Sequence, residues 1–468
     1  MTALVWYRRD LRTHDHPALR AAVDAGEPVV PVFCFDDRLL QGRHRSGPRT
    51  QFLLESLADL REALGALGGA LVVRRGPPEK VLPALAREGG ATRLHFTRDL
   101  SPFARERGHR VAEAARAAGL ELRPSPGLTV VDDVGALRTK SGDRPYTVYS
   151  PFRRAWLEVP RRPVVAPPEA VAVPDGLEPG ALPTLEELGL EQEVAEPMRG
   201  GEREGRRRLA TFLDADVRAY ADNHDALGAD RTSRLSPYLH FGCVSPRELE
   251  SGLPEGDGPE AFHRQLCWRD FYHALLLNFP ANAHLEFQER YRSGLDWPGD
   301  DDAFAAWTEG RTGFPLVDAG MRQLRHEGWM HNRARLVVGS FLTKDLGVDW
   351  RRGERWFMRL LLDGDEANNN GNWQWIASVG ADPAPFFRRM FSPERHQERF
   401  DPDGAYVRRW VPELREVPDA YPRAPSTMPA EVQRAAGCVI GDDYPEPMVD
   451  RAVTRAAASE RYREAARS

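Results

Sequence analysis

The sequence has few cysteines and no long hydrophobic run. The four cysteines, at positions 34, 243, 267 and 438, lie far apart without a CxxC pair, which argues against a zinc site and against a disulfide framework. No apolar stretch approaches the roughly 20 residues that a bilayer span needs, and Arg8, Arg9 and Asp10 interrupt the region where a signal peptide would be uncharged. We therefore expect a cytoplasmic protein with no membrane segment and no bound metal.

The chain also lacks an excess of basic residues. Its net charge is -6, whereas nucleic-acid binding is usually indicated by a basic balance. Only three of the 64 basic residues are lysine, and arginine is the side chain suited to bidentate contact with phosphate. Codon bias in a GC-rich genome is the simpler explanation for so many arginines. Any DNA-binding surface must therefore be a local patch of particular arginines.

Residues 1–130 alternate short apolar runs with helical patterns, which is typical of a parallel sheet covered by helices. The expected strands are 3–6, 29–35, 70–74 and 93–96, and the expected helices are 17–25, 49–67, 78–88 and 101–118. This pattern predicts an α/β fold with a Rossmann-like N-terminal domain. The segment has no GxGxxG motif, so a dinucleotide site in the usual place is not supported.

Residues 131–201 are predicted to be a long interdomain linker. Seven prolines lie between Pro160 and Pro183, a composition that sustains neither a helix nor a central strand. Beyond about Glu202 the pattern is helical, with aromatic residues recurring inside it. We expect residues 202–468 to form an all-helical domain.

Residues 232–237 read Thr-Ser-Arg-Leu-Ser-Pro, with three hydroxyls and an arginine before a proline suited to the first turn of a helix. Free backbone N–H groups at such a start, beside hydroxyls, can hold a pyrophosphate without a glycine-rich loop. Ser245-Pro246 forms a second start of this kind, and Glu248 would complete a capping box. Taken alone, a helix cap is the simpler interpretation of each.

Six sequence blocks carry a resemblance to one family. The run TSRLSPYLHFGCVSPR at 232–247 resembles the flavin-phosphate motif of the photolyase/cryptochrome family, and VWYRRDLRTHDHPAL at 5–19 resembles its N-terminal signature. Four more blocks resemble the family in the expected order: CWRDFY at 267–272, TGFPLVDAGMRQL at 312–324, GWMHNRARL at 328–336 and DGDEANNNGNWQW at 363–375. The similarity covers nearly the whole chain, and the chain most resembles bacterial class I cyclobutane dimer photolyases.

The resemblance implies a bound FAD in the helical domain. The matching residues are Tyr220, Thr232, Ser233, Arg234, Leu235, Ser236, Arg269, Arg335, Asp363, Gly364, Asp365 and Asn369. Asp363, paired with Arg335, and Asp365 would hold the flavin ring and the ribose edge, and Asn369 would face the flavin N5. Arg231 stands where the family usually has glycine, a departure that concerns the local backbone turn rather than FAD.

Three tryptophans match the electron relay of the family. A buried flavin needs an external supply of electrons, and tryptophan is among the most readily oxidised side chains. Trp297, Trp350 and Trp373 match the relay positions, with separations of 53 and 23 residues. Their contact with one another is implied by the resemblance alone.

Other matching residues would bind damaged DNA. Gln265, Trp268 and Arg269 share one face of a helix because they are spaced i, i+3 and i+4. An extrahelical pyrimidine dimer needs an apolar wall, which Trp268 and Trp375 would supply, and polar contacts to its base edges. The resemblance adds Gln265 and Asn332 as polar contacts, and Arg153, Arg333 and Arg388 as phosphate contacts.

Three substrate positions depart from the bacterial cyclobutane enzymes. Gln265 replaces a glutamate, Leu336 a methionine and His224 an arginine. Glutamine at position 265 is familiar from six-four photolyases, but these look to need histidines at the positions of Asn332 and Leu336. We therefore expect light-driven repair of cyclobutane pyrimidine dimers, with six-four repair as an alternative.

A cryptochrome-type photoreceptor is the alternative from another class. Such proteins usually carry a long C-terminal tail, but the chain ends about 24 residues after Tyr444-Pro445-Glu446-Pro447. A non-photochemical FAD oxidoreductase lacks a nicotinamide motif to support it. For an antenna chromophore, FMN, a deazaflavin and an empty site stay open, whereas folate is disfavoured because its Asn-Glu pair is absent from residues 97–107. We expect a monomer.

Overall fold

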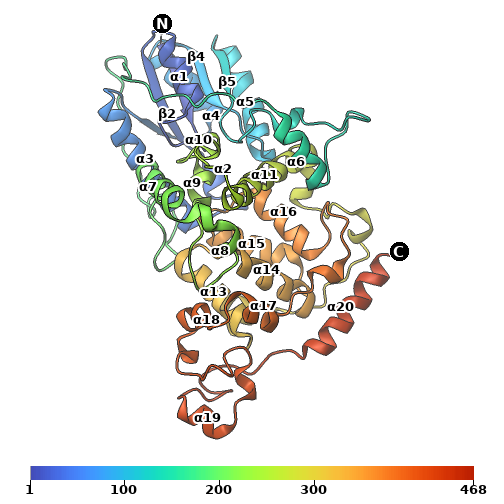
Figure 1. Cartoon of the computed structure of the whole chain (residues 1–468). Coiled ribbons are helices and arrows are strands. Elements are labelled where there is room, and N and C mark those ends of the chain that lie inside the picture. The colour runs from blue at the N-terminus through green and yellow to red at the C-terminus, as the bar shows by residue number, and fades with distance from the viewer. Residues whose placement is uncertain (1, 468) are drawn as a thin grey trace.

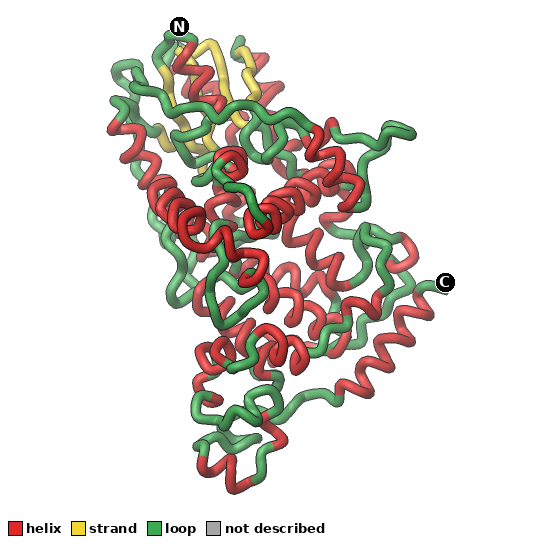
Figure 2. Tube along the Cα trace, viewed as in Figure 1, coloured by secondary structure: helices red, strands yellow, loops and turns green. Residues whose placement is uncertain are grey.

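A five-stranded parallel β-sheet occupies one end of the molecule, and helices make up most of the rest (Figures 1 and 2). The computed structural model describes residues 2–467. Its strands pair in the order β3-β2-β1-β4-β5, and every pair is parallel. They are β1 (Thr2–Tyr7), β2 (Val29–Phe35), β3 (Val72–Arg75), β4 (Ala91–Thr97) and β5 (Glu121–Ser125). The predicted Rossmann-like α/β architecture is confirmed.

Helices cover both faces of the sheet, since both faces of its central strands are apolar. In β1, Leu4 and Trp6 pack toward α4 and α5, whereas Ala3, Val5 and Tyr7 pack toward α1 and α3. The bounds are α1 (Pro17–Asp24), α2 (Asp37–Leu40), α3 (Gly47–Ala66), α4 (Pro78–Glu88) and α5 (Pro102–Ala117). Strands buried on both faces read as continuous apolar runs, and β1 and β2 were predictable for this reason.

Strand β5 was missed by the sequence analysis. Its residues, Glu-Leu-Arg-Pro-Ser, are largely exposed and lie at the edge of the sheet. Pro124 cannot donate a backbone hydrogen bond, which an edge strand tolerates. An edge strand with so little apolar character gives no periodic signal. The sequence therefore predicted four strands where the structure has five.

The proline-rich segment runs along the sheet without forming regular structure. No helix or strand is present between residues 160 and 200, all of which the structure describes. Its backbone carbonyls accept hydrogen bonds from Val29 N (Ala172 O, 2.7 Å) and from Val73 N (Pro179 O, 2.6 Å). The next residue, Gly180, has a φ of +76°, and a Cβ there would lie 2.6 Å from Val73 O. The range 131–201 also contains a helix that was not predicted, α6 (Tyr149–Glu158).

The remainder of the chain is helical, and the predicted all-helical architecture is confirmed. Its helices are α7 (Glu202–Thr211), α8 (Tyr220–Asn223), α9 (Ser236–Phe241), α10 (Pro246–Ser251), α11 (Asp257–Asn278), α12 (Asp301–Glu309), α13 (Pro315–Glu327), α14 (Asn332–Ser340), α15 (Trp350–Leu360), α16 (Glu366–Ala377), α17 (Pro393–Phe400), α18 (Ala405–Trp410), α19 (Ala430–Ala435) and α20 (Arg451–Ala465). No helix within residues 2–467 is long and apolar enough to cross a membrane.

The residues after β1 join the sheet to the helical part. Leu11 N donates to Phe241 O (3.1 Å), and the Arg12 guanidinium donates to Gly242 O (2.9 Å). Gly242 ends α9 with a φ of +67°, and a Cβ there would collide with the backbone of Arg9. One apolar core runs from the sheet face under α3 into α9 and α11. The N-terminal signature block therefore builds the junction between the two parts.

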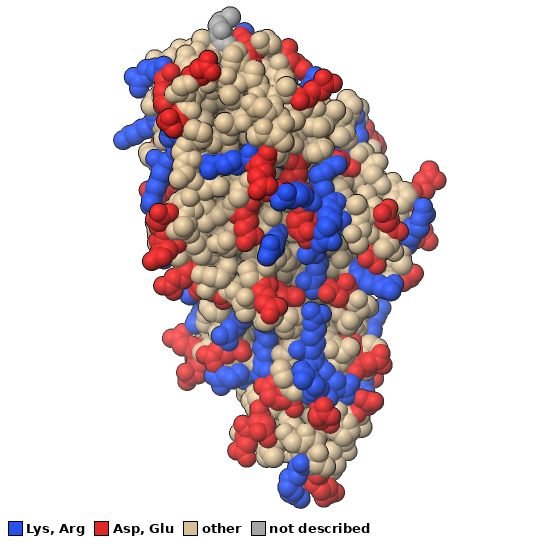
Figure 3. All heavy atoms as spheres, turned by 90° about the vertical axis from the view of Figure 1, so that its left-hand side faces the viewer, with Lys and Arg blue, Asp and Glu red and all other residues tan. Residues whose placement is uncertain are grey.

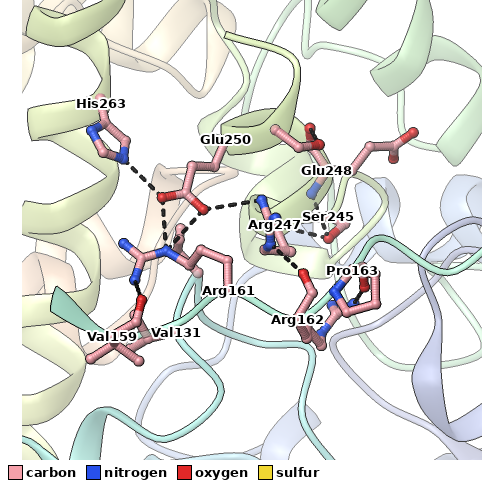
Figure 4. A network of polar contacts seen from close by, with 12 residues as sticks. Val131, Val159, Arg161, Arg162, Pro163, Ser245, Arg247, Glu248, Glu250 and His263 are labelled. Atoms are coloured by element: carbon pink, nitrogen blue, oxygen red, sulfur yellow. Dashed lines mark hydrogen bonds and ion pairs between the residues drawn. The ribbon is translucent and has the colours of Figure 1, made fainter. Parts of the chain in front are cut away.

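A polar network fixes the start of the proline-rich segment to α10 and α11 (Figure 4). Glu250 on α10 accepts hydrogen bonds from Arg161 Nε (3.0 Å), Arg247 (3.2 Å) and His263 Nε2 (2.8 Å). Burial alone would raise the pKa of Glu250, but the bond from His263 and the charge of Arg161 hold that pKa below its usual value. The predicted capping box at Ser245 is only half formed, because the Glu248 carboxylate binds Arg206 instead (2.5 Å).

Candidate functional site

A cavity of about 470 Å³ lies within the helical part, where the predicted cofactor motifs converge. Its walls come from α8, α9, α11, α14 and α16 and from the loops before α9 and α16. Of the predicted site residues, those that line it are Tyr220, Thr232, Ser233, Arg234, Leu235, Ser236, Gln265, Trp268, Arg269, Asn332, Arg335, Asp363, Asp365, Asn369, Trp373 and Trp375. Gly364, Arg153, Arg333, Arg388, Trp297 and Trp350 do not line it. A concave, mostly apolar pocket of this size is typical of a cofactor site.

The loop before α9 presents hydroxyl groups at one end of the cavity. Arg234 adopts a φ of +48° and makes a bidentate ion pair with Asp230, with both N–O distances 2.8 Å. The positive φ values of this turn lie at Asp230 and Arg234, so Arg231 does not occupy a strained position. The Thr232 hydroxyl oxygen is buried and has no partner among the described residues. A phosphate oxygen of FAD would supply that partner.

Two carboxylates from the loop before α16 lie against this end. Asp363 forms a bidentate pair with Arg335 (3.2 and 2.8 Å), as the resemblance implied, and accepts a hydrogen bond from Ser236 Oγ (2.6 Å). Asp365 caps α16 by accepting from Asn368 N (2.9 Å). Both carboxylates are thereby held in fixed orientations at the cavity wall.

Asp365 also forms an ion pair with an arginine that follows strand β1 of the sheet. Arg9 lies 2.5 Å from Asp365, and His240 and His273 lie 3.8 and 3.9 Å from it. Burial alone would raise the pKa of Asp365, but the contacts with His273, the charge of Arg9 and the contact with His240 hold that pKa well below its usual value. Burial lowers the pKa of His240 to about 4 and that of His273 to about 3. The sequence analysis did not identify Arg9, because only the fold brings it to the cavity.

The side chain of Asn369 is oriented by a buried carboxyl group on α15. Its Nδ2 donates to the backbone oxygen of Glu354 (3.0 Å) and to Glu354 Oε1 (3.2 Å). Glu354 is buried, which raises the pKa of its carboxyl group. With Nδ2 directed at Glu354, the amide oxygen is the free polar atom of Asn369. Sequence reasoning missed Glu354, since nothing in its neighbourhood in the chain marks it.

Two aromatic rings at the cavity are each backed by another side chain. Trp268 stacks on Tyr149 with the ring planes 3° apart and the centroids 3.6 Å apart. Trp375 has the Arg389 guanidinium 4.3 Å from its ring centroid and donates to Asp382 (3.0 Å). These contacts hold the rings in place, so Trp268 and Trp375 form a rigid apolar wall.

The polar residues predicted to contact a substrate differ in whether other side chains hold them in place. Gln265 and Asn332 are exposed and line the cavity. His224 and Leu336 line it as well, and the imidazole of His224 stacks on Tyr220 with ring centroids 5.2 Å apart. The side chain of Gln265 makes no hydrogen bond to the described residues, which leaves its amide free to act as donor and acceptor.

The three arginines expected to contact phosphate are in different environments. Arg153 pairs with Glu260 (3.0 Å), and Arg333 makes a two-point pair with Asp225 (3.2 and 2.5 Å). Arg388 is exposed. Figure 3 shows basic side chains in a band down one side of the molecule, bordered by acidic ones. The net charge of -6 therefore does not prevent a local basic surface.

The three relay candidates lie on neighbouring segments. The Trp373 ring packs over Gly353 of α15, where a Cβ would collide with it, and Trp350 is three residues earlier on the same helix. Gly299, two residues after Trp297, donates to Gly347 O (3.0 Å), just before α15. Trp373 and Trp350 are buried, whereas Trp297 is half-buried. Only Trp297 is thus partly exposed at the surface, whereas Trp350 and Trp373 lie in the interior.

No group of three histidine, cysteine, aspartate or glutamate side chains within residues 2–467 could hold a metal ion. The four cysteines are free and buried. Burial raises the pKa of Cys34, Cys243 and Cys267 to about 12, so these thiols are poor nucleophiles. These three thiols are therefore not candidates for a nucleophile at the cavity.

Comparison with known proteins gives matches across nearly the whole chain. Residues 3–172 match the DNA photolyase family, and residues 262–464 match the FAD binding domain of DNA photolyase. A deoxyribodipyrimidine photo-lyase of Streptomyces griseus is 42% identical, with 97% of both chains covered.

Solved structures agree with these matches. A bacterial class III photolyase from Agrobacterium tumefaciens superposes with a TM-score of 0.92 at 34% identity, covering 100% of this chain and 98% of its own. A Synechocystis sp. cryptochrome superposes with a TM-score of 0.89 at 31% identity, covering 98% of each chain. The cavity of the present chain is lined by hydroxyl groups, arginines and apolar side chains that suit FAD. The chain therefore belongs to the DNA photolyase/cryptochrome family and is an FAD-binding photo-lyase.

Proposed function

We propose that the protein repairs cyclobutane pyrimidine dimers in DNA with light. The observation that carries the proposal is the rigid wall of Trp268 and Trp375 beside the free amides of Gln265 and Asn332. A dimer flipped out of the duplex offers two fused pyrimidine rings to stack and polar base edges to bind. The wall and the two amides match these needs.

FAD, when bound, supplies the light absorption and the one-electron chemistry of the reaction. The residues of the chain hold it and set its surroundings. Asp363 and Arg335 fix one edge of the cavity, and Asp365 is kept ionised there by the cation of Arg9. Asn369, oriented by Glu354, presents its amide oxygen toward the cavity. The apolar walls would exclude water from the cavity when FAD and a dimer are bound.

The relay is part of the same proposal. Trp297, Trp350 and Trp373 conduct an electron from the surface to the cavity. The partial exposure of Trp297, the burial of Trp350 and Trp373, and their neighbouring segments support this path. Arg388, exposed and without a carboxylate partner among the described residues, contacts a DNA phosphate. Arg153 and Arg333 contribute when their ion pairs with Glu260 and Asp225 open. The domain division that accompanies the proposal is 1–130, 131–201 and 202–468.

The side chains at the cavity favour cyclobutane dimers over six-four photoproducts. Six-four photolyases look to need histidines where this chain has Asn332 and Leu336. Both of these residues line the cavity, so a general acid is missing at the place where the six-four reaction would use one. A cryptochrome-type photoreceptor is the second candidate function, since one of the superposing structures is a cryptochrome.

The test is light-dependent repair of defined oligonucleotides. The FAD-loaded protein is mixed with a strand that carries one cyclobutane dimer or one six-four photoproduct, illuminated, and compared with a dark control. We expect repair of the cyclobutane dimer alone. Repair of the six-four strand would refute the substrate assignment, and failure to repair either strand would favour the photoreceptor.

A further inference from the structure

The middle tryptophan of the proposed relay has a buried carboxylate on its indole nitrogen. Trp350 Nε1 donates to Glu286 Oε1 (3.3 Å), and both side chains are 1% exposed. Glu286 lies in the loop between α11 and α12, far from Trp350 in the sequence. Among the described residues, neither Trp297 nor Trp373 donates its indole N–H to a carboxylate. The contact distinguishes Trp350 from both neighbours in the relay.

A cation contacts both members of this pair. The Arg351 guanidinium is 4.9 Å from the Trp350 ring centroid and 2.6 Å from Glu286 Oε2. Arg351 also pairs with Asp349 (3.2 Å), and Arg292 Nε donates to the backbone oxygen of Glu286 (3.0 Å). Trp350 is thus in contact with one negative and one positive side chain that neutralise each other.

Oxidation of a buried indole creates a positive charge out of reach of water. Such a charge is costly unless an opposite charge lies nearby. Trp297 is half-buried and can be solvated, and Trp373 adjoins the cavity, but Trp350 has neither advantage. Without Glu286, the nearest charge to an oxidised Trp350 would be the cation of Arg351, which repels it.

We infer that Glu286 is a positioning residue of the relay, which stabilises the oxidised form of Trp350 and so allows the electron to pass. This inference rests on the proposed relay. In the step concerned, Trp350 gives one electron to oxidised Trp373 and becomes a radical cation, and Trp297 then returns one electron to Trp350. No bond forms or breaks, no proton moves, and a thiol reductant in solution restores Trp297.

Two variants that break the ion pair between Glu286 and Arg351 distinguish an effect of charge on Trp350 from an effect on packing. Glu286→Gln keeps the size and a hydrogen-bond acceptor but removes the negative charge beside the ring, so that Arg351 keeps only Asp349 as an ion-pair partner. We expect it to slow oxidation of Trp350 about tenfold or more, the effect of one unit charge at this range near an effective dielectric of about 20. Arg351→Gln removes the repelling charge instead, so oxidation should be as fast as in the wild type or faster. Glu289→Gln, at an exposed carboxylate in the same loop, is the matched control.

The experiment is transient absorption of the FAD-loaded protein, which follows the tryptophan radicals after a laser flash. Slowing by Glu286→Gln together with normal rates for Arg351→Gln and Glu289→Gln supports the inference. Equal slowing by Glu286→Gln and Arg351→Gln would show that the ion pair matters only for packing, and normal rates in Glu286→Gln would also overturn it. Trp350→Phe tests the relay itself, because unchanged photoreduction in that variant refutes the relay whatever Glu286 does.

A second measurement does not depend on photochemistry. Indole N–H resonances of ¹⁵N-tryptophan-labelled protein report the hydrogen bond directly, and Trp350→Phe assigns the peak of Trp350. Glu286→Gln should move this peak, whereas Glu289→Gln should leave it unchanged. A peak that stays in place in the folded Glu286→Gln protein would mean that the carboxylate does not bind the indole, and the inference would fail.

Discussion

Asp270 makes the stability of the protein depend on pH. This side chain on α11 is completely buried and accepts hydrogen bonds from Val130 N (3.0 Å), Val131 N (3.3 Å) and Trp156 Nε1 (2.9 Å). Burial raises its pKa to about 6, although the charge of Arg269 and the three hydrogen bonds oppose this. Asp270 therefore links α11 to residues 130–131 and to α6, and it carries a charge there at neutral pH.

The size of the effect follows from the two pKa values. The folded pKa of about 6 lies above the ordinary value of 3.8, so the folded protein binds a proton more tightly than the unfolded chain. The stability gained in this way is fully present below pH 3.8 and is lost as the pH rises through about 6. At about 1.4 kcal/mol per pH unit it amounts to about 3 kcal/mol, of which about 2 kcal/mol is lost between about pH 4.5 and 7.5.

The assay compares Asp270→Asn with the wild type by urea unfolding, followed by tryptophan fluorescence, across that pH range. The amide cannot ionise, so the free energy of unfolding of Asp270→Asn should rise relative to the wild type by about 2 kcal/mol as the pH increases. Asp442→Asn, at an exposed position, should follow the wild type. A difference that is constant with pH, or that changes in the opposite direction, would refute the raised pKa of Asp270.

Three more predictions concern the cavity and the DNA surface. The logarithm of the binding constant for dimer-containing DNA should fall with log[salt] by roughly 0.9 per phosphate neutralised, and Arg388→Ala should flatten this slope; a salt-independent affinity would contradict the phosphate contacts. Repair by the wild type should be nearly independent of pH between about 5 and 8, whereas Gln265→Glu should add a titration above the ordinary glutamate pKa near 4.3. A flat profile of repair quantum yield against pH in that variant would show that position 265 does not reach the dimer. Arg9→Gln should raise the pKa of Asp365 and reduce the free energy of unfolding by about 3 kcal/mol, the cost of an unpaired buried charge. The variant should also retain less FAD through gel filtration, as measured by flavin absorbance. Full retention of FAD would exclude a role for Arg9 in holding the cofactor.

Much of the fold was predictable because its signals are local. The central strands are buried on both faces and read as apolar runs, and the prolines between residues 160 and 183 exclude regular structure. Edge strand β5 and helix α6 were missed, since the first is polar and exposed and the second lies in a range that was interpreted as a linker.

The residues that line the cavity were predicted from motifs. The side chains that hold those residues in place were not predicted. The pair of Asp363 with Arg335 was expected from the resemblance, and both residues belong to motif blocks. Glu354 and Arg389 lie outside the motifs, and they contact Asn369 and Trp375 only because consecutive elements of the chain fold back on one another. Tertiary contacts of this kind leave no pattern in the chain.

The path of the proline-rich segment has a consequence for solubility during synthesis. Strand β3 is an edge strand, and an uncovered edge is a template for intermolecular strand pairing. The Val73 N–H on that edge donates a hydrogen bond to the carbonyl of Pro179, and Gly180 allows the segment to approach β3 closely. A nascent chain exposes this edge until residue 180 has left the ribosome, and a fragment ending before that residue exposes it permanently. The proline-rich segment thus covers part of an edge that could otherwise pair with a strand of another chain.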